Sequence, residues 1–421
     1  MPEGQAVQHW LEKIEAYLTG TLLPFWIERS PDPAGGFLTW FDRHGNPSGE
    51  TTKTLLMQVR MLYTMASAHR AGYGAGRCGE LARMGAEFLL DHYWDDDNGG
   101  WFWIADRRGR PTCRDKVGYG QVLALYALSE HALATGDARG REAAMRTYAA
   151  ICEHMADTRH GGYYELMTAD WRPAPPGAGG GDRKSMDVHM HAMEALTRLY
   201  ELTGRPTHRR RLDEVIDLIV SRMLHPTHRL GHLQFSLDFR PLPAIIFQTQ
   251  WGRDAPPADG AARPVNLTSY GHNVEFLWLL LHAADVLGRP RETHADLARA
   301  ICDHCAAYGV DGELGGVFVE GPMDGPTDLH EKQFWQHPEV MIGMLDAVAM
   351  FGDEKYWEAF VKVAEFAFEK LVNLAGGGEW YERVDRAGRV LDGDLGHGWK
   401  ISYHTVRGMI QCVRRLRALA Q

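Results

Sequence analysis

A histidine and a carboxylate stand three residues apart in the segment that begins at Tyr270. The segment reads Tyr-Gly-His-Asn-Val-Glu and runs directly into the apolar residues 276–281, which predicts the start of a buried helix. Residues three apart on a helix share a face, so His272 and Glu275 should lie side by side. Histidine has an ordinary pKa near 6.5 and can exchange a proton at neutral pH. We therefore predict that this titratable pair is held on a packed helix for a functional purpose, and Glu275 could orient His272.

Polar residues gather in the same way where five other helices are expected to begin. The candidates at these starts are Lys53, Gln58 and Arg60; Lys116, Tyr119 and Gln121; Asp187, His189, His191 and Glu194; Lys332, Trp335, Gln336 and Glu339; and Trp399, Lys400, Tyr403, His404 and Arg407. We predict function for His191, His272 and His404 because each is the titratable residue of such a start. For Trp335 and Trp399, stacking on a ligand and packing in the core are both open.

Metal binding is an alternative use of the same residues. His189 and His191, together with the pairs His191/Glu194 and His272/Glu275, could coordinate a cation. The established helical metal motifs run Glu-x-x-His or His-Glu-x-x-His, whereas the pairs here have the reverse order. We therefore predict no metal ion and no other cofactor.

The elements that position these residues come from an internal repeat. Two glycines followed by an aromatic or β-branched cluster, often with a later Asp…Gly turn, recur every 62 to 84 residues, with one degraded copy at Gly231, which indicates short β-hairpins. The copies begin at Gly35, Gly99, Gly161, Gly231, Gly315 and Gly377. Two helical stretches lie between consecutive copies, as in 51–71 and 77–94, and the ranges 7–28 and 398–420 complete a set of twelve helices.

Such repeats bury the apolar face of each helical pair against its neighbours. Twelve helices in six pairs can close into an all-α (α/α)6 barrel, with the hairpins on one face, or can form an open solenoid. We predict the closed ring, because the two terminal helices show no polar capping face. The whole chain, 1–421, is then one catalytic domain. The stretch 241–264 is the one long break, and we predict a lid loop or insert there.

The composition excludes several classes of protein. The net charge of −10 and the absence of a long basic run argue against a nucleic-acid partner. No apolar run reaches the roughly 18 residues of a membrane span, and no signal peptide is visible. Six cysteines in 421 residues do not suggest a disulfide framework. We expect a cytoplasmic monomer or homodimer.

Three segments carry a resemblance to a known family. They are 185–195 (Ser-Met-Asp-Val-His-Met-His followed by Glu-Ala), 269–275 (Ser-Tyr-Gly-His-Asn-Val-Glu) and 399–407 (Trp-Lys-Ile-Ser-Tyr-His-Thr-Val-Arg). Together they resemble the N-acylglucosamine 2-epimerase superfamily, which includes cellobiose 2-epimerases and mannose isomerases and folds as an (α/α)6 barrel. The similarity extends over nearly the whole chain.

The resemblance implies roles for individual residues. His272 and His404 match the two acid/base histidines of the family, His191 matches the histidine linked to ring opening, and Arg60 matches the arginine near the reacting oxygens. Glu275 matches the carboxylate partner of the first base. The residues implied or expected to contact the sugar are Trp335, Trp399, Asp187, Tyr119 and Lys53.

The chemistry expected of such a site is proton transfer at carbon 2 of a reducing sugar. The open-chain aldehyde makes this proton acidic enough for a histidine, and a cationic side chain can stabilise the resulting enediolate. Return of the proton to carbon 2 gives the epimer, and return to carbon 1 gives the ketose. Two alternatives stay open: a glycoside hydrolase with Asp187 and Glu275 as its carboxylates, and a non-catalytic ring that binds a protein.

Overall fold

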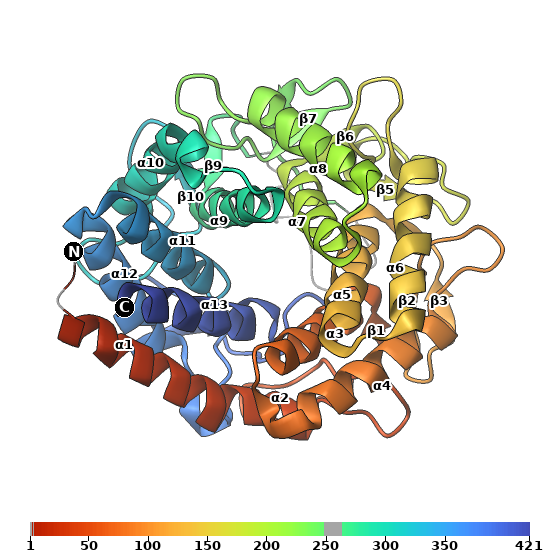
Figure 1. Cartoon of the computed structure of the whole chain (residues 1–421), viewed down its shortest axis with the longest axis horizontal. Helices are drawn as coiled ribbons and strands as arrows, with labels where there is room; N and C mark the ends of the chain where they lie inside the picture. Colours follow the sequence, from red (N-terminus) through yellow and green to blue (C-terminus); the bar gives the residue numbers. More distant parts are fainter. Residues whose placement is uncertain (1, 3, 248–262) are drawn as a thin grey trace.

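The chain folds into a closed ring of paired helices (Figure 1). The structure, a computed structural model, describes residue 2, residues 4–247 and residues 263–421. Within these residues each inner helix packs against the next one, and the last inner helix packs against the first. This contact closes the ring, so the predicted (α/α)6 barrel is confirmed and the open solenoid is wrong.

The helices alternate between an inner and an outer layer along the chain. The inner helices are α3 (Leu55–Arg70), α5 (Gly118–Thr135), α7 (Met186–Thr203), α9 (Tyr270–Leu287), α11 (Gln336–Phe351) and α13 (Tyr403–Leu419). The outer layer consists of α1 (Gly4–Tyr17) with α2 (Leu23–Arg29), α4 (Arg77–His92), α6 (Ala138–Ala150), α8 (Pro206–Leu218), α10 (Ala295–His304) and α12 (Glu354–Phe366). Five π-helical turns extend or join outer helices: η1 (Leu18–Leu22), η3 (Ile151–Met155), η5 (Ile219–Met223), η7 (Cys305–Gly309) and η8 (Ala367–Leu371).

The two layers differ in the way they bury their residues. The inner helix α9 is buried around almost its whole circumference, whereas the outer helix α10 buries a stripe that includes Leu297, Ala298, Ile301 and Cys302. A stripe at this spacing is the signature of a helix with one face toward the core. Cys302 and Cys305 are both buried free thiols. None of the described helices is long and apolar enough to cross a membrane.

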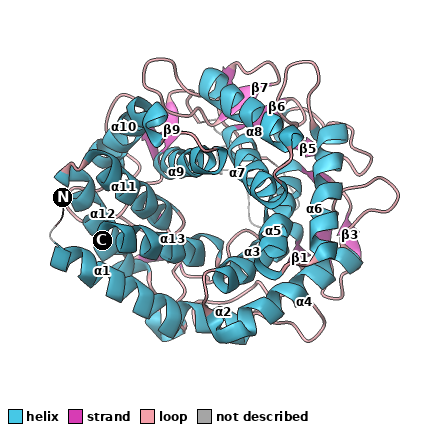
Figure 2. Cartoon of the chain, viewed as in Figure 1, coloured by secondary structure: helices cyan, strands magenta, loops and turns pink. Residues whose placement is uncertain are grey.

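Short antiparallel sheets connect neighbouring repeats (Figure 2). The sheets are β1 (Lys53–Thr54), β2 (Ile104–Ala105) and β3 (Pro111–Cys113); β4 (Lys116–Val117) and β5 (Leu166–Met167); β6 (Arg183–Ser185), β7 (Gln234–Ser236) and β8 (Pro241–Leu242); β9 (Leu267–Ser269) and β10 (Glu320–Pro322); and β11 (Lys332–Gln333), β12 (Arg383–Val384) and β13 (Val390–Asp392). The first strand of each sheet leads directly into an inner helix, so the inner helices begin a few residues later than the sequence predicted. This arrangement gathers the N-terminal ends of the inner helices on the face that carries the strands.

One polar side chain on most inner helices holds the glycine turn of its own repeat. The backbone N–H of Phe37 donates to Gln58 Oε1 at 2.9 Å, and that of Trp101 donates to Gln121 Oε1 at 2.9 Å. The N–H of Val317 donates in the same way to His337 Nε2 at 3.1 Å. His189 and Asn273 make the equivalent bonds to Tyr163 and Gly231. Five of the polar residues at the helix starts therefore hold the fold, and we call them the turn anchors.

A buried ion pair stands beside most turn anchors. The lysine of the strand before the inner helix contacts the first acidic residue of the turn, with N–O distances between 2.7 and 3.1 Å. The pairs are Lys53/Asp32, Lys116/Asp95, Lys184/Asp157 and Lys332/Asp311. In the repeat of α9 both charges are absent together: Thr268 replaces the lysine and donates to the carbonyl of Gly231 at 2.8 Å. The prediction that Lys53 binds a substrate is wrong, because its ammonium is enclosed by Asp32 and backbone carbonyls.

The turn anchors lead to a prediction about stability. His337 donates from Nδ1 to the carbonyl of Gln333 at 2.8 Å and accepts at Nε2, and burial lowers its pKa to about 3, so it is a neutral structural residue. His337→Leu should lower the free energy of unfolding by about 1–3 kcal/mol, because the buried N–H of Val317 loses its acceptor. His337→Gln places the residue type of Gln58 and Gln121 at this site and should cost less than half as much. Urea unfolding of both variants measures the difference, and equal losses would contradict the anchoring role.

Candidate active site

The predicted residues converge on one cavity at the strand-bearing face of the ring. The cavity has a volume of about 540 Å³. The predicted residues that line it are Arg60, Tyr119, Asp187, His191, His272, Glu275, Trp335, Trp399 and His404. They come from all six inner-helix starts, counting Trp335 at the N-cap of α11, and from the loop before α13, so the cavity exists only because the ring closes.

His404 stands on the first turn of α13 and is held by a carboxylate from α11. Its Nδ1 donates to Glu339 Oε1 at 2.8 Å, which leaves Nε2 as the free base. Glu339 also accepts from Trp278 Nε1 at 2.8 Å. Burial, followed by the charges of Arg60 and Arg407, lowers the pKa of His404 well below its usual value. His404 is therefore neutral at pH 7 and can accept a proton.

His272 occupies the first turn of α9, where Ser269 caps the helix. Its Nδ1 lies 3.0 Å from Ser269 Oγ, and its Nε2 lies 3.7 Å from a carboxylate oxygen of Asp187. Burial lowers the pKa of His272, and the charge of Asp187 opposes this shift. The expectation that Glu275 orients His272 is wrong, since Ser269 holds the ring and Glu275 accepts a hydrogen bond from Arg407.

The indole of Trp335 contacts the rings of both His272 and His404, so both histidines lie at the same part of the cavity. Its ring centroid lies 4.4 Å from that of His272 and 5.5 Å from that of His404. Trp335 is half-buried and belongs to the cavity wall. Two neutral imidazoles therefore approach the cavity from different helices, α9 and α13.

His191 differs from the other two histidines because it lies between two acids. Its Nδ1 donates to Glu194 Oε2 at 2.7 Å, and its Nε2 lies 3.4 Å from Asp187 and 3.1 Å from Tyr119 Oη. Burial alone would lower the pKa of His191, but the bonds to Asp187 and Glu194 outweigh it and raise the pKa to about 10. His191 is thus an imidazolium at neutral pH, a donor rather than a base.

Arg60 supplies a second positive charge to the same wall. Its guanidinium donates to Tyr119 Oη at 2.7 Å and to the carbonyl of Trp399 at 3.0 Å. Its Nε is buried and has no partner among the described residues. Arg60 and His191 therefore meet at the hydroxyl of Tyr119, where an oxygen of a ligand could receive hydrogen bonds from charged donors.

Arg407 joins the carboxylates beneath the cavity into one network. Its guanidinium donates to Glu194 at 2.6 Å, to Glu339 at 2.7 Å and to Glu275. Burial and the nearby charge of Glu339 raise the pKa of Glu275 well above its ordinary value. Arg407 thus positions the two glutamates that hold His191 and His404.

Glu339 and Arg407 were among the polar candidates at the helix starts but were not singled out as site residues, although one positional signal exists. Both stand two residues after the position of the turn anchor in their repeats, as do Arg60, His191 and Glu275. The inner-helix starts thus carry a structural residue and, two positions later, a residue that faces the centre of the ring.

Glu275, Glu339 and His404 also form the one group of three possible metal ligands within the described part of the chain. Their ligand atoms lie within 4.8 Å of one another. The guanidinium of Arg407 donates to both glutamates and so supplies the positive charge that a cation would bring. The donor set suits an arginine-centred network better than a metal ion.

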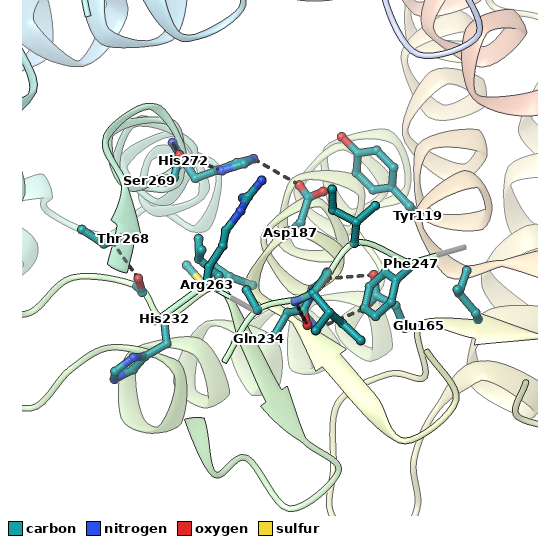
Figure 3. A pocket seen from close by; sticks show the side chains of 18 of the residues that line it. Tyr119, Glu165, Asp187, His232, Gln234, Phe247, Arg263, Thr268, Ser269 and His272 are labelled. Carbon is teal, nitrogen blue, oxygen red and sulfur yellow. Dashed lines mark hydrogen bonds and ion pairs between the residues drawn. The ribbon is translucent and has the colours of Figure 1, made fainter. Parts of the chain in front are cut away.

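A side cavity of about 320 Å³ shares Asp187 and His272 with the main cavity, and Figure 3 shows the residues that line it. Its lining includes Phe247, Gln234 and Glu165. Burial raises the pKa of Glu165 to about 8. The predicted lid 241–264 begins as β8 and continues along the wall of this cavity through Ile245. The central part of that stretch, 248–262, lies outside the described residues.

Residues 36–408 match the model of the N-acylglucosamine 2-epimerase family. The chain belongs to this family. It is 28% identical over 408 residues to the cellobiose 2-epimerase of Bacteroides fragilis, a match that covers 95% of this chain and 97% of the relative. It is 27% identical over 434 residues to the N-acylglucosamine 2-epimerase of Mus musculus, covering 100% and 94%.

A solved structure agrees with the family assignment. The cellobiose 2-epimerase of Spirochaeta thermophila superposes with a TM-score of 0.85 at 28% identity and covers 99% of both chains. This member of the epimerase family is therefore an enzyme of the isomerase class. The alternatives of a glycoside hydrolase and of a non-catalytic ring are not supported by the family match.

Proposed function

We propose that this enzyme interconverts reducing sugars by moving a proton at carbon 2, with His272 and His404 as the two bases. The observation that carries the proposal is the position of Trp335, which contacts both imidazole rings at the wall of one cavity. Burial holds both imidazoles neutral, so either one can remove a proton at pH 7. Bases on two different helices can serve the two faces of a planar intermediate, as inversion at carbon 2 requires.

The remaining residues supply the other steps. The imidazolium of His191, held by Glu194, can donate a proton to the ring oxygen as the sugar opens to its aldehyde, while the carboxylate of Asp187 accepts the proton of the anomeric hydroxyl. Loss of the carbon-2 proton then places negative charge on the oxygens of an enediolate. Arg60 and Tyr119 present donors at this wall, and such donors contribute most when water is excluded. The first histidine can return its proton to carbon 1 to form the ketose. For inversion, the other histidine must first take up a proton from solvent, which it delivers to the opposite face of carbon 2 while the first histidine releases its own proton to solvent.

The two connected cavities support a substrate larger than one hexose. The main cavity alone has the size of a small-molecule site, and the side cavity extends it beyond Asp187 and His272. We propose a reducing disaccharide of the cellobiose type, or a substituted hexose, whose reducing end lies between the histidines. The relatives named as cellobiose and N-acylglucosamine 2-epimerases agree with this range.

Product analysis in heavy water tests the proposal. The enzyme is incubated with cellobiose, N-acetylglucosamine, mannose and glucose, and NMR follows deuterium at carbon 2 and the identity of the product. Incorporation at carbon 2 with formation of the 2-epimer is expected for at least one of these sugars. Failure to incorporate deuterium into any of them would overturn the proposal.

The pKa shifts predict the pH dependence of the reaction. Because burial lowers the pKa values of His272 and His404, kcat/KM should rise with pH through an apparent pKa below 6.5 and then stay level. Protonated His191, with a pKa of about 10, should not contribute to this rise, the acidic limb of the pH profile. Asp187→Asn removes a charge that favours the protonated form of His272, so the limb should move to lower pH. A limb at or above pH 7, or a shift in the opposite direction, would contradict the assignment.

A further inference from the structure

A second pair of cavities lies at the opposite end of the ring from the catalytic site. Their volumes are about 290 and 360 Å³, and both are lined by His282, Gln411 and Arg414. These residues stand toward the C-terminal ends of α9 and α13, whereas His272 and His404 stand at the N-terminal ends of the same helices. The proposed sugar reaction uses none of them.

Arginines from several elements converge on these cavities. The lining arginines are Arg70, Arg198, Arg291, Arg414, Arg415 and Arg417, and the lining carboxylates are Glu130, Glu201, Asp285 and Asp346. With Glu15, which pairs with Arg417, these six arginines face five carboxylates, so the cluster carries one surplus positive charge.

Most of these arginines are paired inside the cluster. Arg70 and Arg198 share Glu130 and Glu201, with N–O distances from 2.5 to 3.3 Å. Arg415 contacts Asp346 at 2.7 Å. The other pairs are Arg291 with Asp285 and Asp346, and Arg417 with Glu15. These ion pairs stabilise the walls of the cavities, and they occupy hydrogen-bond donors of the arginines.

Arg414 is different, because its guanidinium has no hydrogen bond or ion pair within the described part of the chain. Desolvation and then the charges of Arg415 and Arg198 lower its pKa, which shows that like charges surround it. His282 adds a second free group: its Nε2 is buried and has no partner among the described residues. A neutral imidazole can place its proton on this nitrogen and donate it.

We propose that these two cavities form one binding site for a phosphate-bearing small molecule, which Arg414 and His282 bind. A guanidinium matches the oxygens of a phosphate with two parallel hydrogen bonds. A phosphate monoester carries about −1.5 to −2 charges near pH 7 and presents three strong acceptor oxygens, one more than a single carboxylate offers. The oxygens of the phosphate would then accept hydrogen bonds from Arg414 and His282, which have no acceptor among the described residues.

Helix α13 connects this site to the catalytic cavity, because Arg414 lies on the same helix as His404 and Arg407. Tyr63 lines the cavity of about 360 Å³ and also contacts the ring of Tyr403. The hydroxyl of Tyr403 is hydrogen-bonded to Glu194 and Arg407. A bound anion would therefore contact elements that hold the catalytic histidines.

Isothermal titration calorimetry at low ionic strength tests the site with inorganic phosphate, glycerol 2-phosphate and acetate as probes. The wild-type enzyme should bind a phosphate probe at one saturable site and acetate at least tenfold more weakly. Tighter binding of glycerol 2-phosphate than of inorganic phosphate would identify a phosphate ester as the ligand, and equal or weaker binding would identify the free ion.

Variants separate this site from general attraction of anions. Arg414→Gln should weaken phosphate binding at least tenfold, whereas the control Arg209→Gln, an exposed arginine on α8, should leave it unchanged. The exposed position of Arg414 means that the variant should fold. Absence of saturable phosphate binding to the wild type, or equal binding by Arg414→Gln, would overturn the proposal.

Discussion

Replacing His404 by asparagine is expected to lower kcat for epimerisation by about 100- to 10,000-fold, the range that a positioned acid–base group contributes. Asparagine can still donate to Glu339 in place of Nδ1, so the network below the cavity should persist. The variant loses only the free base at Nε2. Steady-state turnover of cellobiose or mannose, with circular dichroism as a check of the fold, measures the effect.

Deuterium exchange makes this test sharper. With one base left, His272 can still remove and return the carbon-2 proton on its own face, so one epimer should exchange with heavy water without inversion. The matched control is His337→Gln, which changes a buried histidine of the same ring that makes only structural hydrogen bonds. Its kcat should stay within about twofold of the wild type. If His404→Asn keeps more than a tenth of the turnover, the two-base mechanism is wrong.

Arg407→Leu is expected to lower the free energy of unfolding at pH 7 by about 3–5 kcal/mol, the usual cost of removing one partner from a buried ion pair. The side chain is 1% exposed and donates to three buried glutamates, which the variant would leave without a cation. Urea unfolding measures the loss. Arg139→Leu is the matched control: its pair with Asp91 is exposed, and such pairs contribute about 0–1 kcal/mol.

The difference in the free energy of unfolding between the wild type and Arg407→Leu should also depend on pH. Burial raises the pKa of Glu194, but Arg407 and His191 outweigh it and depress the pKa to about 2 in the folded state, against an ordinary value of 4.5. A depressed pKa contributes stability that is present above pH 4.5 and is lost as the pH falls toward 2. The gap between the two proteins should therefore narrow below about pH 4.5. A gap smaller than 1 kcal/mol at pH 7, or one that widens in acid, would contradict the role of Arg407.

Much of the architecture follows from local pattern. The recurring glycine turns and the helical pairs between them predict twelve helices in a ring, because each pair can bury its apolar face only against a neighbour. The same repeat predicts that His191, His272 and His404 share one end of the ring. The structure confirms the ring and brings these residues to one cavity.

The sequence does not show which polar residue at each helix start has a structural role and which one lines the cavity. Gln58 and Arg60 are both polar and two residues apart, yet one holds a turn and the other lines the cavity. Residues two apart point in different directions on a helix, and only the closed ring shows which direction is the centre. Lys53 was misassigned because its ion-pair partner Asp32 belongs to the preceding glycine turn, far away in the sequence, and neither residue lines the cavity.

The repeat, the ring and the three histidines can be predicted from the amino-acid sequence, because they depend on spacing within one helix or one hairpin. The carboxylate that holds each histidine is known only from the folded structure. Glu275 shares a helix face with His272 but bonds Arg407, and His404 is held by Glu339 from a neighbouring helix. Contacts between helices that are far apart in the chain leave no local signature, so they are fixed only when the ring closes and the buried charges must find partners.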